Sequence, residues 1–330
     1  MRSLRPIRLA TGLATATVLS LTASGCVTVH GELAVVPAAT RSEAAQALKD
    51  FTAAYNAADK AYDPALDADR VTGPLGAINQ AGLKARQKNN PDGNTNHRPL
   101  ELTDARYLIP KKAGWPRWFL ADTDSNRDED SGKLDTRWLL VFVKSGPGAG
   151  WKTAYLSVVA PSQLPAVAVD GDGRAEPVAA DSSGLAVAPE DLSTRYTQYL
   201  QQGTPDVFAP GTATSGWREA RRTTRRAGFS YQYIDQPLDG GTFAPLGLET
   251  EDGGALVFFS SKHFEQQTAA KGLRPPLNSD VEALLTGELK STLTKERISS
   301  QLVYVPKKGA KDGKVVMLNR LPGLTAAKGS

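Results

Sequence analysis

Cys26 is the only cysteine of the 330-residue chain, and its thiol stands where a lipid could be attached. Three arginines lie near the start, an uncharged apolar stretch covers residues 9–21, and small residues occupy positions 23–25. This layout is typical of a signal peptide over residues 1–25, and the cysteine directly after it predicts an acylated mature N-terminus. Such motifs usually have Leu three residues before the cysteine, where this chain has Ala23. Secretion without a lipid is therefore the alternative.

Five arginines form the most unusual charge pattern of the chain. The sequence predicts a helix over residues 215–227, and at about 100° per residue the five fall within an arc of about 140°. Crowded guanidinium groups repel one another, so the pattern favours contact with anionic lipids, an acidic wall polymer or a membrane protein. The alternative is a solvated face with local ion pairs, for example to Glu219. The five residues are Arg218, Arg221, Arg222, Arg225 and Arg226.

Acidic and amide side chains alternate over residues 122–130, as in the first half of an EF-hand calcium loop. That loop needs Gly at its sixth position and Glu at its twelfth, where this chain has Arg127 and Lys133. We therefore expect a solvated hairpin turn and no metal. The alternating residues are Asp122, Asp124, Asn126, Asp128 and Asp130.

Two glycine-rich stretches match ligand-binding loops only in part. Asp170-Gly171-Asp172-Gly173 could hold calcium, but Asp-Gly pairs are turn formers first. Residues 146–153 look like a phosphate loop, but Trp151 separates the last glycine from Lys152, and the stretch lies between two predicted strands. We expect turns at both places and no cofactor.

The three histidines, His30, His97 and His263, show no metal-ligand spacing, and no Gly-x-Ser-x-Gly nucleophile motif occurs. His263 is the one histidine expected on a core strand. It could act as a general base in a cavity, but a hydrogen-bonded structural histidine is more common. No catalytic residue is assigned.

The charge balance gives no argument for nucleic acid as a partner. The formal net charge is +4, but the predicted signal peptide contributes three arginines and no acids, which leaves 36 basic and 35 acidic residues. With one cysteine there is no intramolecular disulfide. About 300 mature residues are too many for one average core and suit two domains.

The first half of the chain predicts helices followed by strands. Residues 26–39 are expected to form a tether. A capping box of Thr40 and Glu43 then begins a helix with a clear apolar face, which Pro64 ends. A weaker helix follows over residues 74–88. Residues 166–188, rich in Pro, Gly, Asp and Ala, are expected to be a linker. Between them, turns separate four predicted strands, 102–109, 115–121, 136–144 and 151–160.

The order of elements repeats after the linker. One helix is expected from Pro189 to Gly203, then the arginine helix, and a further helix over residues 280–293. We expect domains over residues 40–165 and 189–322 with separate cores, and a C-terminal tail over residues 323–330. The strands predicted in the second half are 229–235, 242–250, 255–264, 297–305 and 314–320.

A leading helix packed on a curved antiparallel sheet resembles the NTF2-like and cystatin-like folds. The predicted fold class is thus α+β, with two tandem domains of this kind. The order of Cys26, helix, sheet, the stretch AVAVDGDG at 166–173 and LAVAP at 185–189 resembles a family of actinobacterial lipoproteins described as a domain of unknown function. The resemblance implies a lipid anchor at the outer face of the cell membrane. It brings no activity and no site residues with it.

We therefore expect a lipid-anchored extracytoplasmic protein with a non-catalytic binding or structural role. One alternative is a hydrolase or isomerase acting in an NTF2-like cavity, which converging polar residues in a deep pocket would favour. Another is an accessory subunit of a membrane complex, which would show as an exposed apolar patch.

Overall fold

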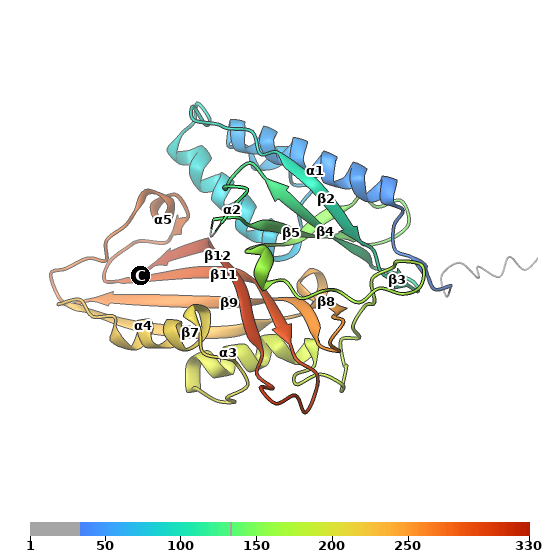
Figure 1. The fold of residues 1–330 in the computed structure, drawn as a ribbon. Coiled ribbons are helices and arrows are strands. Elements are labelled where there is room, and N and C mark those ends of the chain that lie inside the picture. The colour runs from blue at the N-terminus through green and yellow to red at the C-terminus, as the bar shows by residue number, and fades with distance from the viewer. Residues whose placement is uncertain (1–33, 133) are drawn as a thin grey trace, which may run out of the picture.

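The first half of the chain builds a four-stranded antiparallel sheet with one helix on its face and a second helix that begins at its edge and continues across strands of the second half (Figure 1). The computed structural model describes residues 34–132 and 134–330. The strands follow the spatial order β2-β4-β5-β6. The helices and strands lie within a few residues of the predicted positions: α1 Arg41–Ala61, α2 Gly73–Asn89, β2 Leu102–Leu108, β4 Arg117–Ser125, β5 Arg137–Lys144 and β6 Lys152–Val159.

Helix α1 begins at the predicted capping box. The Glu43 amide donates to Thr40 Oγ1 at 3.1 Å, and the Thr40 amide donates to Glu43 Oε2 at 2.8 Å. Its apolar face, which includes Leu48 and Phe51, packs on the sheet. The helix ends at Tyr62, which adopts a left-handed conformation with φ 50°.

The last residues of the predicted tether belong to the folded structure. Val36–Pro37 (β1) pairs antiparallel with Lys111–Lys112 (β3), and Ala38 and Ala39 are buried. The predicted tether is therefore too long at its C-terminal end, because its apolar residues pack against the first half. The predicted signal peptide, Cys26 and residues 27–33 lie outside the described residues.

The second half builds a larger sheet in the spatial order β10-β12-β11-β9-β7, with β8 also paired to β9. All pairs are antiparallel except the short β10–β12 pair. The strands are β7 Phe229–Leu238, β8 Leu246–Glu249, β9 Ala255–Ala269, β10 Leu285–Thr286, β11 Thr292–Val305 and β12 Val316–Gly329. The helices are α3 Leu192–Gln202, α4 Trp217–Thr223 and α5 Ser279–Ala283.

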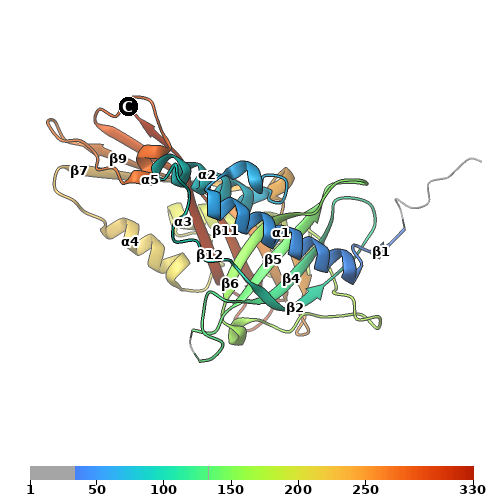
Figure 2. The same cartoon turned by 90° about the horizontal axis from the view of Figure 1, so that it is seen from above.

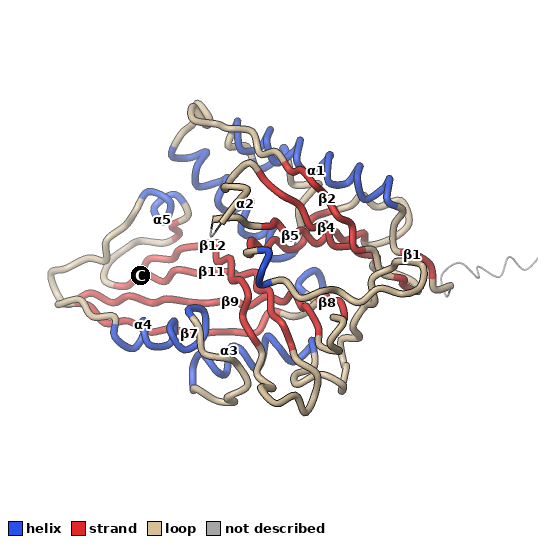
Figure 3. Tube along the Cα trace, viewed as in Figure 1, coloured by secondary structure: helices blue, strands red, loops and turns tan. Residues whose placement is uncertain are grey.

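The two sheets lie between two sets of helices, α1 and α2 on one side and α3 and α4 on the other (Figure 3). Alternate residues of β9 explain this order of layers. Leu256 and Phe258 belong to an apolar cluster with the first sheet, whereas Val257 and Phe259 belong to a cluster with α3. Because side chains alternate across a strand, β9 is covered on both faces.

The prediction of two separate cores is wrong, because a shared apolar cluster joins the sheets. Leu120, Leu139 and Tyr155 from the first sheet pack in one cluster with Phe258 and Leu302 from the second. The Tyr155 hydroxyl also lies 2.8 Å from the Phe243 carbonyl oxygen. The physical reason is that the first sheet is apolar on both faces, and its helices cover only one of them. The boundaries 40–165 and 189–322 stay a prediction.

Three predicted segments differ from the structure. Strand β12 pairs with β11 as far as Gly329, so residues 323–329 are sheet and not a tail. Helix α5 is far shorter than the predicted 280–293, because β10 and β11 take up its second part. The predicted linker lies along the second half through isolated bridges, Val167 to Thr250 and Leu185 to Lys307. The α+β class itself is confirmed.

Candidate functional site

A groove between α3, α4 and β7 gathers three of the predicted arginines. It has a volume of about 830 Å³. The α3 wall contributes Leu200 and Gln201, and the β7 wall contributes Tyr233 and Asp235. The α4 side contributes Ser215, Gly216, Arg218, Glu219, Arg221 and Arg222. The groove is thus lined by both basic and acidic groups, and the charge that it presents to a ligand depends on which of them form ion pairs with one another.

Helix α4 is shorter than predicted, so the five arginines do not share one helical face. A π-helical turn over Thr212–Gly216 precedes it, and Thr224 leaves the helical conformation with ψ 118°. Arg225 and Arg226 follow the helix in an exposed segment before β7. The Arg226 guanidinium lies 4.4 Å from the centre of the Phe229 ring.

Arg221 is buried in an ion pair, so its predicted exposure is wrong. Its two terminal nitrogens lie 2.7 and 2.9 Å from the two carboxylate oxygens of Asp235. The side chains are 9% and 0% exposed. Arg222 is exposed as predicted, at 73%, and pairs with Glu219. Two of the five arginines therefore have local carboxylate partners.

Asp235 also holds His263, which extends a buried polar network. His263 Nδ1 lies 2.6 Å from an Asp235 carboxylate oxygen, and His263 Nε2 lies 2.9 Å from Ser261 Oγ. Burial raises the pKa of Asp235, but hydrogen bonds from His263 and Arg221 outweigh it and hold the pKa below its usual value. Burial lowers the pKa of His263 to about 4, although the hydrogen bond to Asp235 opposes it. His263 is therefore neutral at neutral pH.

The order Ser261, His263, Asp235 matches the connections of a catalytic triad. However, Ser261 is 0% exposed and His263 is 3% exposed. Ser261 Oγ also lies 2.5 Å from the side-chain amide of Gln301. A nucleophile must reach its substrate, and Ser261 is fully buried, so the arrangement holds Asp235 and Arg221 in place.

Trp217 lies between two guanidinium groups. Those of Arg221 and Arg320 lie 3.6 and 3.4 Å from its ring centre, within the range of cation–π contact. These three residues also line a smaller cavity of about 170 Å³ beside the groove, together with Arg297. Burial lowers the pKa of Arg320 to about 10, so the group stays charged at neutral pH.

Among the arginines that line the groove and the smaller cavity, Arg218 and Arg320 have no carboxylate partner within the described residues. Arg221, Arg222 and Arg297 each form an ion pair, whereas Arg218 and Arg320 form none within the described residues. The Nε atoms of both unpaired side chains are buried and have no hydrogen-bond partner. Buried charges are normally paired, so these two positions are where an external anion would be stabilised.

The Arg218 side chain lies close to the end of α3. Its guanidinium is 5.3 Å from the centre of the Tyr199 ring. Gly203 ends α3 in a left-handed conformation, φ 82°, and a Cβ there would lie 2.6 Å from an Arg218 nitrogen. Glycine at this position therefore both ends the helix and leaves room for the arginine.

Sequence reasoning missed the partners of the arginines. A signal for Asp235 exists, because Phe229, Tyr231, Tyr233 and Asp235 alternate on one face of β7. That pattern places a carboxylate among aromatic side chains, where it needs a cation. Arg320 contacts Trp217 from β12, about a hundred residues away in the chain. No local sequence pattern predicts this contact.

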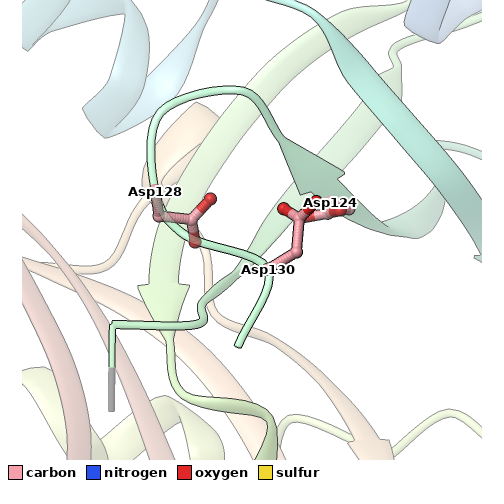
Figure 4. A group of neighbouring side chains, drawn as sticks. All are labelled: Asp124, Asp128 and Asp130. Atoms are coloured by element: carbon pink, nitrogen blue, oxygen red, sulfur yellow. The ribbon is translucent and has the colours of Figure 1, made fainter. Parts of the chain in front are cut away.

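The predicted acidic loop brings three of its carboxylates together. Asp124, Asp128 and Asp130 each have an oxygen within 4.8 Å of the others (Figure 4). The turn already uses some of these oxygens: the Thr136 amide donates to Asp128 at 2.7 Å, and the Ser125 amide donates to Asp124 at 2.7 Å. The cluster on its own fits a hairpin turn.

Asp122 does not belong to that cluster. It is buried on β4 and pairs with Arg106 and Arg137 at 2.6 and 2.8 Å. The Asp170 stretch is a turn as predicted, since the Asp172 and Arg174 amides both donate to the Asp170 carboxylate. Residues 145–151 connect β5 and β6, as predicted for the glycine-rich stretch.

Comparison with known proteins places this helix-covered pair of sheets in a family. The family described as "Domain of unknown function (DUF8094)" matches residues 35–329, and the chain belongs to it. Within the described residues, no helix is long and apolar enough to cross a membrane. No solved structure matches the chain.

Three relatives are named as lipoproteins. "Uncharacterized lipoprotein SCO2278" of Streptomyces coelicolor is 55% identical over 96% of this chain and 94% of its own length. An "Uncharacterized lipoprotein" of Streptomyces avermitilis is 52% identical over 97% of this chain and 95% of its own. "Uncharacterized lipoprotein SCO6871" of S. coelicolor is 28% identical over 69% of this chain and 63% of its own. The predicted actinobacterial lipoprotein family is thus confirmed.

Proposed function

We propose that the protein is anchored through an acylated Cys26 to the outer face of the cell membrane and binds an anionic envelope ligand without catalysis. The observation that carries the binding role is the pair of charged arginines without a carboxylate partner, Arg218 in the groove and Arg320 in the smaller cavity beside it; Arg221 lines both. The paired Arg221 provides a fixed wall between them.

An acidic wall polymer fits this groove better than the anchoring bilayer does. The described chain begins at β1, and α4 lies at the opposite end of the molecule (Figure 2). The groove, which α4 lines, therefore lies far from β1, the first described strand. Phosphate or carboxylate groups repeated along a polymer would contact Arg218 and Arg320 and, further out, Arg222.

The experiment is a titration of the mature chain with oligo(glycerol phosphate), followed by Trp fluorescence and calorimetry. Replacing Arg218 and Arg320 by Gln should weaken binding about tenfold for each arginine, because a hydrogen bond to a charged group contributes about 1.5 kcal/mol. The matched control replaces Arg225 and Arg226 by Gln, which removes the same charge outside the groove. Equal losses in both double variants would mean diffuse surface attraction and contradict a groove site.

The anchor is tested separately. Mass spectrometry of the purified membrane form should find acyl chains on an N-terminal Cys26. The Cys26→Ser variant should be released from membranes or remain an unprocessed precursor. Mature wild-type protein that starts at another residue and stays unbound to membranes would contradict the anchor while leaving the groove unaffected.

The finer fold assignment is part of the same proposal. Two halves related to NTF2-like or cystatin-like domains are supported by the recurrence of one helix on one antiparallel sheet, α1 on the first and α3 on the second. Superposing the two halves of an experimental structure on each other would test this assignment.

A further inference from the structure

A second surface, rich in tryptophan and basic residues, lies where the described chain begins. Val36 and Pro37 are fixed there by pairing with Lys112 and Lys111, and the Ala38 amide donates to the Pro110 carbonyl at 2.8 Å. Val35, one residue earlier, is 66% exposed. The first described residues therefore lie at a defined point of the protein surface (Figure 1).

Two tryptophans and two cations surround this point. Trp115, Arg117, Lys144 and Trp151 line a hollow of about 290 Å³ together with residues 36–40. Arg117 lies 4.7 Å from the Trp115 ring centre, and Lys144 lies 6.0 and 5.8 Å from the Trp115 and Trp151 ring centres. All four side chains are partly exposed.

The cations of this surface are not neutralised by ion pairs. Neither Arg117 nor Lys144 forms an ion pair with any residue that the structure describes, whereas Lys111 pairs with Asp170 at 2.6 Å. Glu43 also borders the hollow, but its carboxylate is engaged by Thr40 in the α1 capping box. Besides the hydrogen bonds from Thr40, Arg117 and Lys144 also help to hold the pKa of Glu43 below its usual value, so the hollow carries two cations and one carboxylate, with a net positive charge to meet an external anionic surface.

The covalent connection limits the distance between this surface and the anchor. Eight residue steps separate Cys26 from Ala34, which span at most about 30 Å when fully extended. An acyl chain on Cys26 would keep the Trp115 surface close to the headgroups, whereas the arginine groove lies at the other end of the molecule (Figure 2).

We propose that Val35, Trp115, Arg117, Lys144 and Trp151 form a membrane-docking surface for an anionic lipid bilayer. Tryptophan has an apolar body and a polar N–H, and it is enriched at membrane–water interfaces for that reason. Basic side chains next to it are attracted by anionic headgroups within a Debye length. Docking would orient the protein so that the α4 groove points away from the bilayer. This inference rests on a lipid at Cys26, but not on what the groove binds.

The test measures which tryptophans reach the bilayer. The mature chain is coupled through the single thiol, Cys26, to a maleimide lipid in vesicles of phosphatidylcholine and phosphatidylglycerol, so that the result does not depend on natural acylation. Brominated lipids then quench tryptophans that touch the bilayer. We expect quenching that falls by at least half when Trp115 and Trp151 are replaced by Phe. Replacing Trp217 by Phe, in the groove region, should leave it unchanged.

Two double variants that remove positive charge test the electrostatic contribution to membrane docking. Arg117→Gln with Lys144→Gln should reduce quenching on anionic vesicles, and high salt should have the same effect on the wild type. Arg225→Gln with Arg226→Gln is the matched control and should have no effect. Near-ultraviolet circular dichroism shows whether each variant is folded. Absence of wild-type quenching, or quenching that depends on Trp217, would overturn the proposal.

Discussion

At the scale of single residues, Asp235 organises the site, because one buried carboxylate binds two basic groups. It forms a two-point ion pair with Arg221 and a hydrogen bond with His263. Arg221 in turn stacks on Trp217. The position of Trp217, which lines the smaller cavity beside the groove, therefore depends on a carboxylate whose side chain is fully buried.

Asp235→Asn should destabilise the fold strongly. It leaves the Arg221 guanidinium buried without its counter-charge, and breaking such a pair costs about 3–5 kcal/mol. Urea unfolding measures the loss. Glu219→Gln, which breaks the exposed pair to Arg222, is the control and should leave stability nearly unchanged. A small loss for Asp235→Asn would mean that water reaches the pair.

The stability of the protein should fall as the pH drops from about 6.5 towards 4. Burial lowers the pKa of His263 to about 4, so the unfolded chain takes up this proton at a higher pH than the folded protein does. The stability due to neutral His263 is full above about pH 6.5 and is lost through this window, in total about 3 kcal/mol. His263→Gln should flatten the slope of unfolding free energy against pH. An unchanged slope would show that other groups cause it.

At the scale of elements, local sequence signals predicted α1 and the strands of the first sheet. They failed where contacts between distant parts of the chain determine where an element ends. The capping box and apolar face of α1 lie within the helix itself. By contrast, α4 ends at Thr223 and α5 at Ala283, while their sequences favour longer helices. The second part of the predicted 280–293 helix pairs with strands far along the chain, and such pairing leaves no local pattern.

The acidic loop between β4 and β5 should behave as a turn. Millimolar calcium should leave the melting temperature unchanged, because a ligand stabilises a protein only if it binds the folded state preferentially. The loop has Arg127 where an EF-hand requires Gly, and its Asp128 carboxylate already accepts the Thr136 amide. A rise of several degrees that disappears in Asp124→Ala would show a calcium site at Asp124, Asp128 and Asp130.

At the scale of the whole molecule, the order of layers separates two surfaces that the sequence could not separate. Charge pattern alone allowed the arginines to face the membrane to which we propose that Cys26 is anchored. The structure places α4 and the first described residues at opposite ends (Figure 2). Between them the two sheets share one apolar layer. We therefore expect a rigid spacer, in which the position of one end fixes the direction of the other.

Rigidity of this kind predicts a single unfolding transition for the whole chain. Phe258 belongs to the shared layer, and Phe51 belongs to the cluster under α1; both are buried, with 1% and 2% exposed. Replacing either by Ala should cost about 3–5 kcal/mol. If the halves unfold together, each variant shows one calorimetric peak, and the two variants shift its temperature downwards by similar amounts. If the halves are independent, Phe51→Ala splits the trace and leaves the second half at its original temperature. We expect one peak in each variant, because separating the sheets would expose Leu120, Tyr155 and Leu302 in both halves at once.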